Sequence, residues 1–202
     1  MANQGPTAKD EGRRTNDEGR TTNDEGRTTN GGDLLRFSSF ALRPILILGL
    51  GNPLQADDGV GCRLIEALAT RELPSDVEAL DGGAPGIGLI NLLEGRRRVI
   101  IVDAAEMGRP AGAIVRFRPE EVTFTGSAER FSLHRTAVAD ALALARALDL
   151  PLPEITFFGV QPGRIGWSDA LGPEVAATLP ALVEAVLAEA RREAARVTPS
   201  QA

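Results

Sequence analysis

The chain is poor in the side chains that most often carry covalent catalysis. Its 202 residues include one cysteine, Cys62, and one histidine, His134. A single cysteine excludes a disulfide within the chain and argues against a zinc-cysteine cluster. Cys62 stands inside a helical pattern, so we expect it in the core. Because Gly-x-Ser-x-Gly and Cys-His arrangements are also missing, covalent serine or cysteine catalysis has no support.

Residues 9–29 contain no apolar side chain. They repeat a seven-residue unit that reads KDEGRRT, NDEGRTT and NDEGRTT. A coiled coil needs apolar residues at two positions of each heptad, and a segment without a face to bury cannot offset its ordering entropy. We therefore expect residues 1–42 to be a disordered tail or the product of an upstream start, and residues 198–202 to be disordered as well.

Long apolar runs are also absent, so the sequence contains no segment that could span a bilayer. The chain has 28 acidic and 22 basic residues, which argues against a nucleic-acid partner. These features favour a cytoplasmic protein without membrane or nucleic-acid partners, and we expect it to be a monomer. Residues 43–197 have the length of a single catalytic domain.

The folded part predicts strands that alternate with helices. This order is typical of an α/β protein, and we expect a three-layer αβα sandwich, phosphorylase/hydrolase-like, with a mostly parallel twisted sheet of about five strands. The predicted strands are Ile45–Leu50, Val77–Leu80, Val99–Val102, Ala113–Phe117 and Ile155–Val160. The predicted helices are Val60–Ala69, Ile87–Leu93, Thr136–Leu148 and Pro173–Arg196, with Pro180 as a kink or restart.

The most informative stretch is Ile45–Gly61, which reads ILILGLGNPLQADDGVG. It places two acids, Asp57 and Asp58, between the carboxyl end of a strand and the amino end of a helix, where α/β proteins build their sites. A dinucleotide fingerprint is incomplete, because Leu54 stands where the third glycine would be. Asp58 can also be a plain helix N-cap, and we assign Asp57 a supporting or solvated role.

Other polar residues are predicted along the same edge of the sheet. Asn52 follows the first strand, Asp81 the second and Asp103 the third. With His134, the carboxylates of Asp58 and Asp103 would suit a borderline divalent ion such as nickel or zinc. No local spacing links these three, so His134 can also be incidental and Asp103 can cap a turn.

Two further features have two interpretations each. Asp81, Gly82 and Gly83 form a second glycine-rich turn, which either lets an extended peptide approach the backbone or is a plain turn. Trp167, the only tryptophan, lies in a Gly/Pro-rich loop. It is either a lid or partner contact, or a partly buried packing residue, and the composition favours packing.

Several motifs follow one another along the chain. They are GLGNPLQADDGVG, LDGGAPG at Leu80–Gly86, VIIVDAA at Val99–Ala105, the histidine in SLHR, FFGVQP, Trp167 and LGPEV at Leu171–Val175. Each motif is weak alone, but as an ordered set over Ile45 to Ala188 they resemble the hydrogenase maturation protease family.

The resemblance implies a nickel-dependent endopeptidase. Such enzymes remove a C-terminal extension from the immature large subunit of a NiFe hydrogenase after nickel insertion. By motif match, Asp58, Asp103 and His134 would contact nickel carried by the substrate, and would act in a metal-assisted or an aspartic-type cleavage. Asn52, Asp81, Gly82 and Gly83 would bind the substrate. Gly172 departs from the usual Ser or Thr of the family.

Two other functions compete with this one. A peptidyl-tRNA hydrolase has a similar GLGNP turn, but continues with an Arg-His-Asn stretch where this chain has Ala56-Asp57-Asp58-Gly59. A nickel checkpoint or chaperone that binds the large subunit without cutting it would use the same residues, so the sequence leaves this alternative open.

Overall fold

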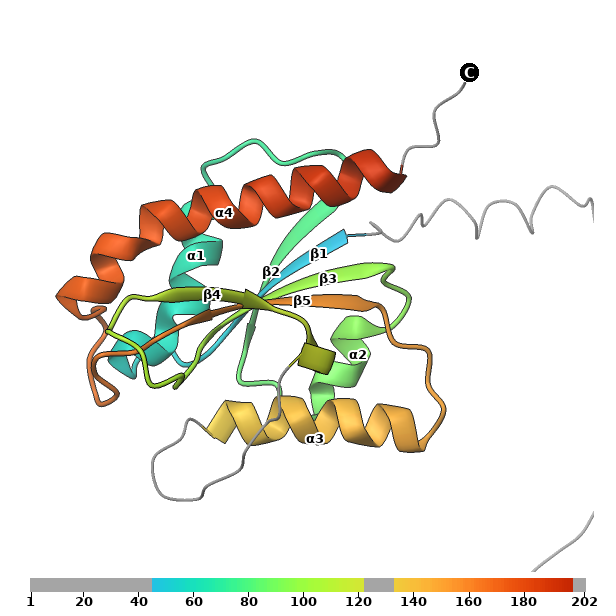
Figure 1. Ribbon diagram of the computed structural model, residues 1–202, viewed down its shortest axis with the longest axis horizontal. Coiled ribbons are helices and arrows are strands. Elements are labelled where there is room, and N and C mark those ends of the chain that lie inside the picture. Colours follow the sequence, from blue (N-terminus) through green and yellow to red (C-terminus); the bar gives the residue numbers. More distant parts are fainter. Residues whose placement is uncertain (1–44, 122–132, 198–202) are drawn as a thin grey trace, which may run out of the picture. The chain divides into compact units, whose positions relative to one another are not determined.

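The computed structural model describes residues 45–121 and 133–197, with side chains of the second range described for residues 138–196. They form one five-stranded sheet in the order β2-β1-β3-β5-β4 (Figure 1). Four strands are parallel, and β4 runs antiparallel to β5 at one edge. The strands are β1 (Ile45–Leu50), β2 (Val77–Gly83), β3 (Arg98–Ala104), β4 (Ile114–Phe117) and β5 (Glu154–Val160).

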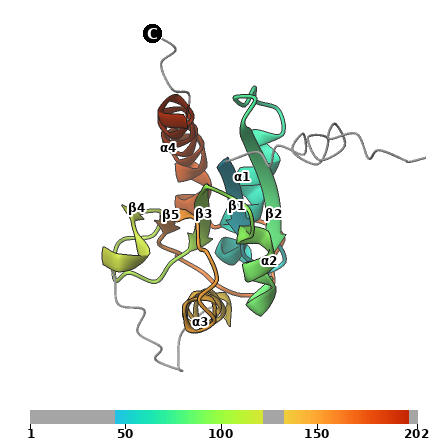
Figure 2. The same cartoon turned by 90° about the vertical axis from the view of Figure 1, so that its right-hand side faces the viewer.

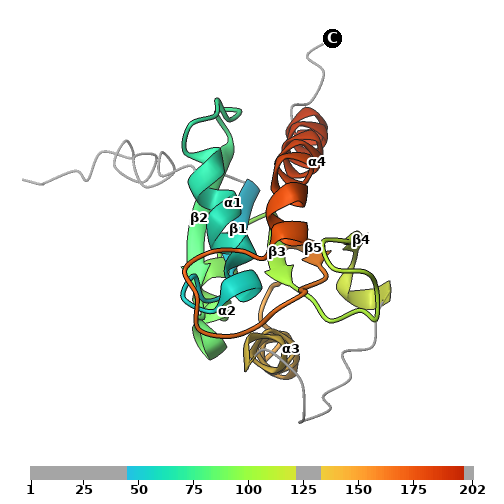
Figure 3. The ribbon, with the colours of Figure 1, turned by 90° about the vertical axis from the view of Figure 1, so that its left-hand side faces the viewer.

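Helices cover both faces of the sheet, as the predicted three-layer sandwich requires. The helices α1 and α4 lie on one face, and α2 and α3 on the other (Figures 2 and 3). Within the described ranges, no helix has the length and apolar character needed to cross a membrane. The helices are α1 (Val60–Leu68), α2 (Leu89–Leu93), α3 (Leu133–Ala147) and α4 (Pro173–Val197).

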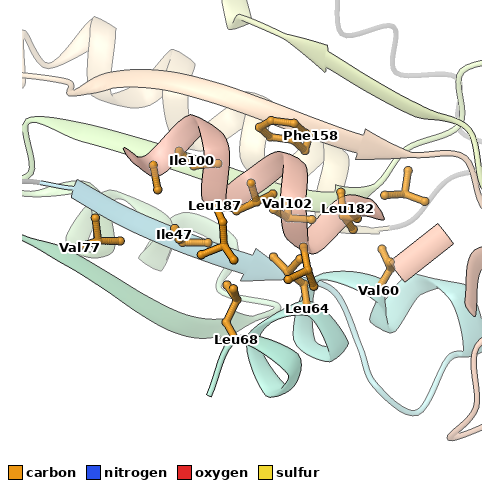
Figure 4. Packing of buried hydrophobic residues seen from close by; sticks show 14 of the residues in the cluster. Ile47, Val60, Leu64, Leu68, Val77, Ile100, Val102, Phe158, Leu182 and Leu187 are labelled. Atoms are coloured by element: carbon orange, nitrogen blue, oxygen red, sulfur yellow. The ribbon is translucent and has the colours of Figure 1, made fainter. Parts of the chain in front are cut away.

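The central strand β1 is buried on both sides, which explains its uninterrupted apolar run. Ile45 and Ile47 pack toward α1 and α4, where they meet Leu64 and Leu187 (Figure 4). The alternate residues of β1 point to the opposite face, toward α2 and α3. The sheet therefore separates two apolar layers, and β1 contributes to both.

Most element boundaries differ from the predicted ones by one to three residues, and two of the differences concern candidate site residues. Asp81, Gly82 and Gly83 are the last residues of β2, so their prediction as a turn was wrong. The strand continues because Asp81 and Gly83 still pair with β1, across an irregularity in the register. Only one side of this edge strand is paired, so it tolerates polar and glycine residues. Asp103 likewise lies within β3, one residue before its end.

The helix α1 and the strand β1 touch backbone to backbone. A Cβ atom on Gly49 would lie 2.3 Å from the carbonyl oxygen of Gly61, and a Cβ on Gly61 would lie 2.3 Å from that of Leu50. Neither position can accept a side chain unless the helix moves away. The two glycines therefore allow the start of α1 to pack directly against the end of β1.

An ion pair with a buried carboxylate fastens α4 to the edge strand β4. The carboxylate of Glu189, which has no solvent exposure, accepts hydrogen bonds from Nη2 of Arg116 at 2.7 Å and from Nε at 3.2 Å. Arg192 contacts the same carboxylate. Burial by itself raises the pKa of Glu189, but the hydrogen bonds and charge of Arg116 outweigh it and hold this pKa below its ordinary value.

This pair predicts acid sensitivity. Because the folded-state pKa of Glu189 is depressed, its stabilisation is complete above the unfolded pKa and is lost as the pH falls through the folded one. We expect Glu189→Gln to lower the free energy of unfolding by about 1–3 kcal/mol at neutral pH, measured by urea unfolding. The difference from the native chain should shrink in acid, below about pH 4.5.

The control is Glu184→Gln on the same helix. Glu184 forms an exposed ion pair with Arg71, so its loss should change the free energy of unfolding by less than about 1 kcal/mol. Equal losses in the two variants, or a Glu189→Gln difference that does not shrink in acid, would contradict the role of the buried carboxylate.

Candidate active site

Asp58 is held by the turn that follows β1. Gly51 has a φ of +124°, and a Cβ atom there would lie 1.8 Å from the carbonyl oxygen of Asp58. The backbone N–H of Asn52 donates to Oδ2 of Asp58 at 2.9 Å. The side-chain oxygen of Asn52 accepts a hydrogen bond from the N–H of Leu54, so this side chain shapes its own turn. Asp58 is thus completely buried and fixed in orientation.

Asp103 lies on the strand beside β1. In the parallel register Gly49 pairs with Val102, directly before Asp103. A Cβ atom on Gly61 would lie 2.5 Å from the carbonyl oxygen of Val102, so the start of α1 also touches β3 here. Asp103 is 7% exposed. The structure therefore brings Asp58, in the turn after β1, and Asp103, on the neighbouring strand β3, to the same edge of the sheet.

His134 falls in the first turn of α3, which begins three residues earlier than predicted, and its side chain lies outside the described residues. Among the side chains that are described, no three of histidine, cysteine, aspartate or glutamate gather into a group that could hold a metal ion. The predicted group of Asp58, Asp103 and His134 therefore stays a prediction. Two buried carboxylates are suitable donors for a divalent ion when an imidazole joins them.

Asp81, the third strand-end acid, is held by the only cysteine. Cys62, buried in α1 as predicted, lies with its Sγ 3.2 Å from Oδ1 of Asp81. Burial and the hydrogen bond to Asp81 raise the pKa of this thiol to about 12, so it stays protonated and donates to the carboxylate. Asp81 also accepts from the N–H of Gly83. The sequence pattern placed Cys62 in the core but did not indicate this contact.

Gly82 and Gly83 face different surroundings. A Cβ atom on Gly82 would meet the ends of Leu48 and Leu50 at 2.8 and 3.0 Å, toward the core. At Gly83, which has a φ of +53°, a Cβ would meet nothing within 4 Å. The carbonyl oxygen of Gly83 accepts a hydrogen bond from the N–H of Gly51. Gly83 thus joins the end of β2 to the turn that holds Asp58 and leaves open space.

Asp57 is not solvated, so that part of its predicted role was wrong. It is 1% exposed, and its carboxylate accepts hydrogen bonds from three backbone N–H groups. These belong to Gly163, Arg164 and Gly172, at 2.9, 2.7 and 2.6 Å. All three lie in the segment that leads from β5 to α4. Asp57 therefore fastens this loop, which Figure 3 shows in orange, onto the turn that carries Asp58.

The same contact leaves little room for a side chain at position 172. A Cβ atom on Gly172 would lie only 3.1 Å from Oδ1 of Asp57. The N–H of Gly172 donates to that oxygen, so the backbone satisfies the carboxylate directly. Asp57 and Gly172 are more than a hundred residues apart, and nothing in their local sequences indicates that they meet.

Two more residues near this edge of the sheet were not anticipated from the sequence. One was assigned the wrong environment, and the other was overlooked. Trp167 is 84% exposed, so its interpretation as a partly buried packing residue was wrong. Gln161 is buried beside the end of β5. Its side-chain oxygen accepts hydrogen bonds from the N–H groups of Met107 and Arg109, which lie after Asp103. The FFGVQP motif was the available signal for Gln161.

The contacts of Asp57 lead to a stability prediction. Asp57→Ala would leave three backbone N–H groups without their acceptor, so we expect a loss of roughly 3 kcal/mol in the free energy of unfolding. Hydrogen exchange at Gly163, Arg164 and Gly172 should accelerate. In the control Asp169→Ala, which removes an exposed acid from the same loop, these amides should keep their protection. Unchanged exchange in Asp57→Ala would contradict the fastening.

Known proteins are similar to this chain in sequence. Residues 62–189 match the family model of the hydrogenase maturation protease. The chain is 35% identical over 157 residues to the hydrogenase expression/formation protein HupD of Rhodobacter capsulatus, an alignment that covers 77% of this chain and 73% of that protein. It is 36% identical over 162 residues to the hydrogenase 2 maturation protease of Escherichia coli, covering 78% of this chain and 97% of that one.

Solved structures of proteins with the same function as these relatives have a similar fold. The hydrogenase maturating endopeptidase HybD from E. coli superposes with a TM-score of 0.66 at 36% identity, over 74% of this chain and 93% of that one. The [NiFe] hydrogenase maturation protease HybD from Thermococcus kodakarensis gives a TM-score of 0.59 at 34% identity, over 72% and 98%. This chain therefore belongs to the hydrogenase maturation protease family and is an endopeptidase of hydrogenase maturation.

Proposed function

We propose that this endopeptidase recognises nickel in the immature large subunit of a NiFe hydrogenase and then removes the C-terminal extension of that subunit. The observation that carries the proposal is the pair of buried carboxylates at one edge of the sheet, Asp58 in the turn after β1 and Asp103 on the neighbouring strand β3. With His134 they offer the oxygen and nitrogen donors that suit a borderline divalent ion. Nickel is thereby part of the substrate rather than a resident cofactor.

The three residues can contribute to hydrolysis in two ways. Nickel, when it arrives with the substrate, supplies polarisation of the scissile carbonyl or of a water molecule. Asp58, Asp103 and His134 then hold the substrate in place. In the other route the two carboxylates themselves act as general base and general acid. In both routes the hydrogen bond from Asn52 keeps Asp58 aimed at the edge of the sheet.

The edge strand β2 is suited to receive the extension as an added strand. It pairs with β1 on one side, and no other described strand pairs with its outer side. Backbone groups on a free edge can bind an extended peptide by β-augmentation. Gly83 ends β2 beside the turn of Asp58 and leaves open space, so a peptide along β2 would lead to the acids.

Membership of the protease family favours cleavage over a chaperone that binds without cutting, and it argues against a peptidyl-tRNA hydrolase. Membership of the family gives the general class of substrate, a hydrogenase. The large subunit, its nickel, the cytoplasmic location and the monomeric state stay predictions.

The nickel-recognition proposal is tested with a nickel-loaded precursor. We expect Asp58→Asn and His134→Ala to keep the fold and to slow removal of the extension by about 100-fold or more, followed by mass spectrometry of the large subunit. The control Asp169→Asn removes an exposed acid and should cleave at the native rate. Undiminished cleavage by Asp58→Asn and His134→Ala, or equal cleavage of nickel-free precursor by the native chain, would reject the proposal.

The β2 edge is tested at Gly83. Asparagine tolerates a positive φ, so Gly83→Asn should keep the backbone while filling the open space with a side chain. We expect KM for the precursor to rise several-fold with little change in Tm. The matched control is Gly95→Asn, at an exposed position with a φ of +68° beyond α2. Equal kinetics in both variants would argue against peptide binding along β2.

A substitution at Gly82 distinguishes a role in core packing from a role in precursor binding. Because a Cβ on Gly82 points at Leu48 and Leu50, Gly82→Val should lower Tm before it affects precursor affinity. This order is the one that a purely structural glycine would give, whereas a direct role of Gly82 in peptide binding would impair precursor affinity first.

A further inference from the structure

We propose that Leu54, Ile165 and Trp167 form a docking surface for the folded body of the hydrogenase precursor, separate from the groups that contact the scissile segment. The inference rests on the proposed function, since it takes a hydrogenase precursor as the substrate. We call these three residues the docking surface.

The docking surface is assembled by pairing between two distant segments. The N–H of Ser168 donates to the carbonyl oxygen of Leu54 at 3.0 Å, and the N–H of Ala56 donates to that of Ser168 at 2.9 Å. Gln55 and Ser168 form a parallel bridge, so Leu54 and Trp167, one residue earlier on each side, are neighbours. Both segments adjoin the turn that holds Asp58.

The backbone under the docking surface is firmly held. The buried carboxylate of Asp57 binds the N–H groups of Gly163 and Arg164, directly before Ile165, and that of Gly172 beyond Trp167. The N–H of Asp57 also donates to the carbonyl oxygen of Arg164 at 3.2 Å. An ordered surface loses little conformational entropy when a partner binds. The exposure of Trp167 is therefore a property of an anchored loop.

The exposure itself is unusual for such side chains. Trp167 is 84% exposed, Leu54 55% and Ile165 46%. They are half of the large apolar side chains that the described residues expose; the others are Ile87, Leu148 and Leu150. Tryptophan is enriched among the residues that dominate binding energy at interfaces. Exposed apolar side chains that lie together mark interaction sites.

Continuity with the active site identifies the occupant. An endopeptidase of hydrogenase maturation must bring a segment of a whole protein to Asp58, so the protein next to that segment comes to lie over the neighbouring turn. Leu54 is in that turn, and Trp167 is paired to it. A peptide along β2 would reach the turn at Gly51, which binds Gly83, whereas the docking surface lies where Leu54 and Ala56 pair with Ser168. The docking surface is therefore left for the folded part of the precursor.

The first test measures the affinity for the precursor at equilibrium, without relying on cleavage. We expect Trp167→Ala to raise Kd about tenfold or more, and Leu54→Ala to raise it less. Both side chains are exposed, so Tm should not change. The control Leu148→Ala removes an equally exposed leucine at the carboxyl end of α3 and should leave Kd unchanged. A Kd within twofold of the native value for Trp167→Ala would overturn the proposal.

The second test observes Trp167 directly, because it is the only tryptophan of the chain. The protein is labelled with 5-hydroxytryptophan, which can be excited apart from the tryptophans of the precursor. Saturating precursor should reduce quenching by acrylamide several-fold. If quenching stays the same in the complex, Trp167 is not covered and the proposal fails.

Two further outcomes separate this proposal from others. If Trp167→Ala changes a dimer of this chain into a monomer in sedimentation and leaves precursor affinity intact, the surface binds a second copy instead, and the proposal is overturned. Failure of nickel recognition shows in a different measurement, equal cleavage of nickel-free and nickel-loaded precursor. The Kd and quenching results do not depend on that comparison, so the two proposals can fail independently.

Discussion

The close contact between β1, the turn after it and α1 is the constraint on which the rest of this site depends. It exists because Gly49, Gly51 and Gly61 have no Cβ atoms, and backbone atoms of the neighbouring segment occupy the space where those atoms would lie. The contact sets the depth of the turn at the end of β1. Both adjacent acids, Asp57 and Asp58, take their positions from it.

Asp57 and Asp58 face different segments of the chain and therefore have different roles. Asp57 turns to the loop between β5 and α4 and binds its backbone, whereas Asp58 is held by the N–H of Asn52 at the edge of the sheet. One carboxylate thus organises the loop that presents Trp167, and the other is the one that we propose for chemistry. A single short turn joins the proposed active site to the proposed docking surface. The folded body of the precursor and its scissile segment would therefore bind at neighbouring sites.

Much of this was predictable, because local patterns determine local structure. The apolar runs of β1 and β3 are long enough to indicate strands buried on both faces, and their alternation with helices predicts a mostly parallel sheet. Parallel strands put their carboxyl ends on one edge, so Asp58 and Asp103 could be expected there. The end of β2 was not predictable in this way, because Asp81, Gly82 and Gly83 read as a turn when their pairing with β1 is unknown.

The layers of the fold, the edge that carries the acids and the family resemblance follow from periodicity and from short motifs in order, so the amino-acid sequence is enough to predict them. The folded arrangement is needed to see which of two adjacent aspartates fastens a loop, that Cys62 holds Asp81 and that Trp167 faces solvent. Each of these depends on contacts between residues far apart in the chain. Asp57 and Gly172 look like an acid and a glycine in unrelated loops until the fold places one against the other.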